Sequence, residues 1–104
     1  MREINFNVNQ QRIKNIDSIS HIYGGTDNYL CLVFAFGEGW DDCVKGISFV
    51  RKNKEELPML LKDNKCTVPA EAFDGMQLVF YLVGKKKSPK YRIETQKFTI
   101  KLGG

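Results

Sequence analysis

The stretch from Tyr29 to Phe36 reads YLCLVFAF and is followed by Gly37-Glu38-Gly39, which interrupts the apolar run. Such a run is too short for a membrane span, which needs about 20 apolar residues. Its large apolar and aromatic residues are typical of a β-strand. We therefore expect residues 29–36 to form a central strand of a sheet.

The segments around this strand also have the two-residue period of β-structure. Ile4, Phe6 and Val8 alternate with polar residues, which predicts a half-buried strand with one polar face. Pro58 predicts that its segment, residues 57–61, is an edge strand, because proline cannot donate a ladder hydrogen bond. The other expected strands cover residues 12–19 with a bend near Asn15, 43–50, 65–68, 76–83, 91–94 and 97–102.

Helical signals are confined to one short segment, Pro69–Phe73, which has proline at the first position and Glu71 in the first turn. Turn-forming clusters, such as residues 24–28, and a polar loop at residues 84–89 separate the strands. About eight short strands with at most one helical turn predict an all-β protein, an antiparallel β-sandwich or barrel, and we favour the sandwich. The alternative, a β-grasp fold, requires a helix that the sequence does not show.

The composition is that of a single globular domain spanning residues 1–104. Hydrophobic residues make up 42% of the chain and charged residues 27%, and seven Phe, four Tyr and one Trp supply a core without need of metal or disulfides. Neither a membrane span nor a signal peptide is recognisable, so we expect synthesis in the cytoplasm. Cys31, Cys43 and Cys66 are odd in number and widely spaced, which favours buried thiols over disulfides.

The residues needed for catalysis or metal binding are scarce. His21 is the single histidine and belongs to no zinc or Ser-His-Asp pattern, although Ser18 and Ser20 lie near it in sequence. The glycine pairs do not have the spacing of phosphate-binding loops. We therefore expect no enzymatic activity, no metal and no cofactor.

The lone tryptophan, Trp40, is flanked by Glu38, Asp41 and Asp42. These carboxylates could bind calcium or act as an acid–base pair, but the alternating oxygen ligands of a calcium loop are missing. A solvated turn above a packed Trp40 is the favoured interpretation. Trp40 itself is expected to be a core residue or an interface anchor, with the core preferred.

Positive charge is concentrated towards the C-terminus. Residues 85–104 contain seven Lys or Arg and one Glu, whereas residues 1–84 contain nine Lys or Arg and eleven acidic residues. The densest part is a candidate partner-binding stretch made of Lys85, Lys86, Lys87, Lys90, Tyr91 and Arg92. It could contact an acidic protein or a nucleic-acid backbone, or it could be a solvated hairpin tip that discourages aggregation. Nucleic acid is the less favoured partner, because Tyr91 is the one aromatic side chain available for stacking.

The chain ends in Gly103-Gly104. This dipeptide occurs in ubiquitin-like modifiers, but it also serves as a flexible joint or a plain chain end.

Several of these features occur in an order found in a known family. They are residues 4–11, the apolar strand closing on Trp40-Asp41, a strand ending at Phe49, residues 66–69 followed by Glu71, a strand ending at Val83-Gly84, and Thr95. Over residues 3–102 the chain resembles the N-terminal β-sandwich domain of phage baseplate upper proteins. The resemblance implies a virion protein that docks onto a phage tail or baseplate through protein–protein contacts, and it supplies no catalytic residues.

Two functional hypotheses therefore remain for this chain. The first is a structural adaptor in the virion, assembled in the host cytoplasm, with itself or other virion proteins as partners and with no membrane association. In that scheme the Asn-rich N-terminal strand is a candidate docking edge. The alternative is a small phage-encoded protein outside the virion that inhibits a host defence factor through the basic stretch at residues 85–92.

Overall fold

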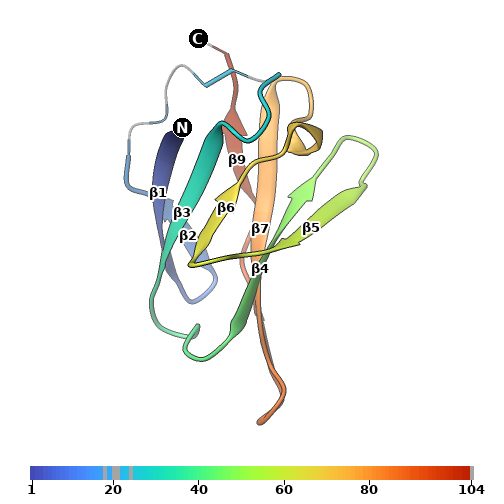
Figure 1. The fold of residues 1–104 in the computed structure, drawn as a ribbon. Coiled ribbons are helices and arrows are strands. Elements are labelled where there is room, and N and C mark those ends of the chain that lie inside the picture. The colour runs from blue at the N-terminus through green and yellow to red at the C-terminus, as the bar shows by residue number, and fades with distance from the viewer. Residues whose placement is uncertain (18, 20–21, 24, 104) are drawn as a thin grey trace.

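A computed structural model describes residues 1–17, 19, 22–23 and 25–103, and it confirms the all-β sandwich (Figure 1). Two sheets, one of four strands and one of five, pack against each other. The strands are β1 (Arg2–Asn9), β2 (Arg12–Asn15), β3 (Leu30–Phe36), β4 (Val44–Val50), β5 (Glu56–Leu60), β6 (Lys65–Thr67), β7 (Gln77–Lys86), β8 (Tyr91–Glu94) and β9 (Phe98–Lys101).

The first sheet has the order β2-β1-β3-β6. Its pairs are antiparallel except for β1 and β3, which run parallel with Phe6 opposite Phe34. This pair departs from the antiparallel pairing of the rest of the sandwich. It arises because β3 lies on the side of β1 opposite β2: the β1–β2 hairpin has already reversed the chain, so the next strand runs parallel to β1.

The strand expected over residues 12–19 is shorter than the sequence indicates, since β2 ends at Asn15. The chain nevertheless follows β1 a little further. Ile16 donates its backbone N–H to the Asn5 carbonyl, and the Asp17 carboxylate accepts hydrogen bonds from the backbone and side chain of Asn5. Both hydrogen bonds from Asn5 stabilise the ionised form of the Asp17 side chain, so they lower the pKa of Asp17.

The second sheet has the order β5-β4-β7, with β8 and β9 both paired to the far side of β7. The edge position of β5 confirms the prediction made from Pro58. The two last strands are separated at Thr95, whose hydroxyl oxygen accepts a hydrogen bond of 2.9 Å from the Leu82 N–H. A side chain thus replaces a backbone acceptor where the ladder is interrupted.

The core lies between the sheets and is rich in aromatic rings. Phe6 of β1 stacks on Phe34 of β3 with ring centroids 5.3 Å apart, and its edge faces Phe80 of β7 at 5.7 Å. Such pairs contribute about 0.5–1.5 kcal/mol beyond the burial of their area. Alternation along β1, β3 and β7 therefore places the apolar residues inward, as the sequence predicts.

The helical segment is reduced to a 3₁₀ turn, Ala70–Ala72, preceded by Pro69. No longer helix occurs among the described residues, so the β-grasp alternative lacks its helix there. Within the same residues, no helix has the length and apolar character needed to cross a bilayer. The three cysteines are buried and free of disulfides, and burial raises the pKa of the Cys66 thiol to about 11.

Candidate functional site

Trp40 lies in the core, with only 1% of its surface exposed. Its indole N–H donates a hydrogen bond of 2.7 Å to the Gln10 carbonyl, and its ring packs on Phe36 with centroids 4.9 Å apart. Beneath the ring lies Gly84, where an added Cβ would be 2.9 Å from two indole carbons. Of the two positions open to Trp40, the core is the one observed, and no surface of the ring remains for a partner.

The basic stretch forms the hairpin between β7 and β8. The loop expected at residues 84–89 is shorter than predicted, because β7 continues to Lys86. Strand alternation then places neighbouring lysines on opposite faces of the sheet. Lys85 pairs with Arg92 across the hairpin, and Lys86 pairs with Tyr91. The structure therefore divides the predicted patch into two faces and a tip.

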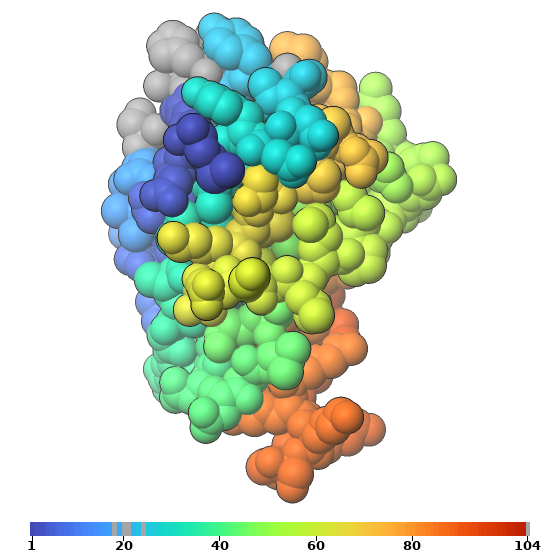
Figure 2. Space-filling model, in the orientation of Figure 1, coloured from blue at the N-terminus to red at the C-terminus, as the bar shows by residue number. Residues whose placement is uncertain are grey.

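The hairpin projects beyond the rest of the molecule, at the bottom of Figures 1 and 2 (orange). Lys87 and Lys90 are exposed at its tip. The Tyr91 side chain is 36% exposed, but its hydroxyl donates to the Gly39 carbonyl at 2.8 Å, and the Lys86 ammonium lies 4.9 Å from its ring centroid. Lys86 therefore occupies one face of the single aromatic ring that the basic stretch offers for stacking.

The Asn-rich N-terminal strand is not a docking edge. β1 lies between β2 and β3 and is hydrogen-bonded on both sides. The outward side chain of Asn5 is already bonded to Asp17. Alternation in the sequence identified which residues of β1 are buried, but it carries no information on the neighbours of the strand.

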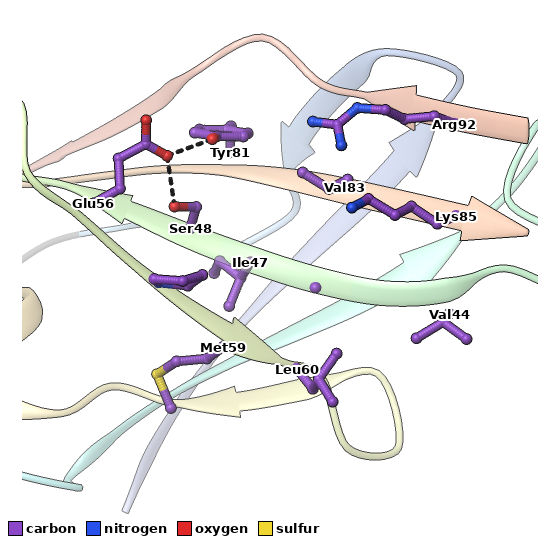
Figure 3. A pocket seen from close by; sticks show the side chains of 12 residues that line it. Val44, Ile47, Ser48, Glu56, Met59, Leu60, Tyr81, Val83, Lys85 and Arg92 are labelled. Atoms are coloured by element: carbon purple, nitrogen blue, oxygen red, sulfur yellow. Dashed lines mark hydrogen bonds between the residues drawn. The ribbon is translucent and has the colours of Figure 1, made fainter.

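A groove of about 390 Å³ lies instead on the outer face of the second sheet (Figure 3). Its floor is the backbone around Gly46, a glycine in the middle of β4 that leaves a gap between Leu60 of β5 and Val83 of β7. Val44 and Leu60 on its rim are 66% and 75% exposed. We call this surface the outer groove; it is lined by Val44, Gly46, Ile47, Ser48, Glu56, Pro58, Met59, Leu60, Tyr81, Val83, Lys85 and Arg92.

One end of the outer groove is acidic. The Ser48 hydroxyl donates to Glu56 Oε1 at 2.8 Å, and the Tyr81 hydroxyl donates to the same oxygen. The bond from Tyr81 is the main cause that lowers the pKa of Glu56, and that from Ser48 adds to it; the same carboxylate raises the pKa of Tyr81. Glu56 is therefore a fixed anion, and its second oxygen has no hydrogen-bond partner among the described residues.

The other end of the outer groove is basic, as Figure 3 shows. Lys85 and Arg92 project there from β7 and β8. The Arg92 guanidinium is paired with Glu94 at 2.9 Å, whereas Lys85 has no ion-pair partner among the described residues. Two residues of the predicted basic stretch thus belong to this groove. The sequence signal that could have revealed it is Gly46, since a glycine inside a strand marks a place where the sheet is left bare.

Those of the remaining candidates that the structure describes form no site. Glu38, Asp41 and Asp42 lie in the turns around Trp40, and the described part of the chain contains no group of three residues able to hold a metal ion. His21, Ser18 and Ser20 lie outside the described residues, as do Gly24 and Gly104. Gly103 donates its N–H to the Ile22 carbonyl at 2.7 Å, so it is held against the body of the domain.

Comparison with protein-family models, with curated proteins and with solved structures found no match for this chain. The chain is therefore classified by its fold and by the outer groove. It is a β-sandwich domain with an exposed, largely apolar groove on one outer face.

Proposed function

We propose that this chain is a phage virion structural protein, a tail or baseplate adaptor domain that docks by protein–protein contacts and not by catalysis. Its partners in this proposal are other virion proteins or further copies of itself, and its location is the virion after assembly in the host cytoplasm. Two things support the proposal: the order of sequence features, which resembles that of baseplate upper proteins, and the outer groove on the second sheet.

The observation that carries the proposal is the outer groove. Sheet faces turned to solvent are usually polar, and the outer face of the first sheet follows that rule with Glu3, Asn7 and Lys65. The second sheet instead exposes Val44 and Leu60 around bare backbone. Contiguous exposed apolar residues with a polar rim are typical of protein interaction sites.

Mass spectrometry of gradient-purified particles from the phage or induced prophage that encodes the chain tests this proposal. The expected result is the chain at a copy number close to that of other tail proteins. Finding the chain in the lysate and not in the particles would overturn the virion role.

A second candidate, an inhibitor of a host defence factor acting outside the virion, is favoured by the projecting basic hairpin. Reversing Lys85, Lys86 and Lys87 together would not separate the two candidates, because Lys85 belongs to the outer groove. Lys87→Glu with Lys90→Glu changes the tip alone. If the hairpin is the contact, this double variant should lose its partner; a docked adaptor should retain its place in the particle.

A further inference from the structure

We propose that two copies of this chain pack face to face through the outer groove, in an isologous dimer in which Glu56 of each copy meets Lys85 of the other. This inference rests on the proposed function, which assigns docking to the same surface. It adds the occupant, a second copy, and the residues that set its orientation.

The β5 edge of the second sheet, which borders the outer groove, is a poor alternative. Leu61 donates its N–H to Lys45, and Arg51 donates to Glu55, so the odd-numbered residues of β5 and its ends face β4. Residues 56, 58 and 60 then turn their backbone groups to the open edge. Pro58 has no N–H to offer there, which is a common way of blocking strand addition. Strand addition next to the outer groove is therefore disfavoured at β5, and the groove itself is the surface there that a partner can cover.

The two ends of the outer groove carry opposite charge. Glu56 lies opposite Val50 and Lys85 opposite Val44, and these two valines are six residues apart on β4. At roughly 3.3 Å per residue the charged ends are about 20 Å apart along the strand direction. A twofold axis lying between two facing grooves and across their length brings the acidic end of one copy to the basic end of the other, twice.

The state of the two charged side chains also suits this contact. Tyr81 and Ser48 both bond Oε1 of Glu56, and Oε2 has no hydrogen-bond partner among the described residues; the Lys97 ammonium acts on this carboxylate only through its charge. Lys85 is exposed and has no ion-pair partner among the described residues. Leu60, between the two ends, and Val44, at the basic end, are apolar and largely exposed, and the hollow over Gly46 gives a partner side chain room to enter. Charge thus sets the orientation, and apolar burial supplies the affinity.

Sedimentation equilibrium of four samples tests the inference: the wild type, Glu56→Lys, Lys85→Glu, and an equal mixture of the two variants. The wild type is expected to dimerise. Each single variant replaces two attractive pairs by two repulsive ones, which should raise the dimer dissociation constant roughly 30-fold. In the mixture, the lysine introduced at position 56 of one variant faces the glutamate introduced at position 85 of the other. The second contact keeps the native pair, so the dimer should return.

The controls separate this effect from changes in net charge or folding. Lys101→Glu and Glu38→Lys make the same charge changes at positions outside the groove and should leave the dimer intact. Leu60→Ser should weaken the dimer at least about tenfold, while Met76→Ser, at a side chain 71% exposed elsewhere, should not. Recovery in the mixture also demonstrates that both variants are folded.

A monomeric wild type at millimolar concentration, or single variants that dimerise as the wild type does, would overturn the inference. These outcomes are distinct from failure of the proposed function. A monomer that is found in particles overturns the dimer alone, and a dimer that is absent from particles overturns the virion role alone.

Discussion

Replacing Gly84 by alanine should destabilise the domain, although glycine within a strand is normally a weakness. Gly84 lies in β7 with its α-carbon beneath the Trp40 ring. An added Cβ would sit 2.9 Å from Cε3 and Cζ3 of the indole and 3.1 Å from Cγ2 of Ile93. Carbon atoms pack best at about 3.5–4.0 Å. The ring cannot shift freely, because its N–H is bonded to Gln10 and its face packs on Phe36.

The magnitude follows from two opposing contributions. Overpacking of a filled core costs about 1–3 kcal/mol. Replacing a strand glycine by alanine also stabilises the folded state by about 0.5–1 kcal/mol, because alanine has less conformational freedom than glycine in the unfolded chain. The net loss should be about 1–2 kcal/mol in the free energy of unfolding, which lowers Tm by roughly 5–15 °C in a domain of this size.

Urea and thermal unfolding followed by circular dichroism measure this loss. Gly46→Ala is the matched control, since the same change in β4 meets only the Met59 carbonyl, at 3.2 Å, and otherwise opens onto the outer groove. Its stability should stay within about 1 kcal/mol of the wild type. Trp40→Phe removes the indole carbons that clash, so Gly84→Ala should cost at least about 1 kcal/mol less in that background. A stabilised Gly84→Ala variant, or costs that add without coupling, would refute the reasoning.

Three further outcomes are expected. Thr95→Val should cost about 1–3 kcal/mol, because the buried Leu82 N–H loses its acceptor, while Thr95→Ser should retain most of the stability in the same urea titration. Because the pKa of Glu56 is lowered, the ionised side chain stabilises the folded state fully at pH values above the ordinary carboxyl pKa, and this stabilisation is lost as the pH falls through the lowered pKa. The Tm of Glu56→Gln should therefore fall less steeply with decreasing pH than the Tm of the wild type. Burial raises the pKa of Cys66 to about 11, so iodoacetamide at neutral pH should label this thiol only after unfolding, as read by peptide mass spectrometry.

Alternation in the sequence was a sufficient guide to the sandwich. It identified Ile4, Phe6 and Val8 as an inward face, and Pro58 as a mark of an edge strand, because burial and the missing N–H act on one strand at a time. The parallel pairing of β1 with β3 could not be obtained in this way. It depends on β3 lying beside β1 and not beside β2, and the two-residue period of a strand does not determine which strand becomes its neighbour.

The candidate site was only partly accessible to the same reasoning. The charge of the basic residues is visible in the sequence. Gly84, however, indicates the end of a strand, so the sequence does not predict that β7 continues through it and places Lys85 and Lys86 on opposite faces of the sheet. Gly84 is small because Trp40 occupies the space above it. Trp40 and Gly84 are 44 residues apart in the sequence, and the alternation of residues within one strand gives no information on contacts at that separation.

The two strand glycines, Gly84 and Gly46, leave hollows on opposite faces of the second sheet. Each leaves a hollow on one face of the second sheet, and on the inner face Trp40 of the same chain fills it. On the outer face no described residue fills the hollow, and the neighbouring Leu60 and Val44 remain exposed. A face of this kind promotes aggregation unless a partner covers it, and Pro58 already protects the adjoining edge. If a second copy is that partner, stability depends on association, so the Tm of the wild type should rise with protein concentration, and the rise for Leu60→Ser should begin only at concentrations at least about tenfold higher. Equal, concentration-independent Tm values in differential scanning calorimetry would contradict this argument.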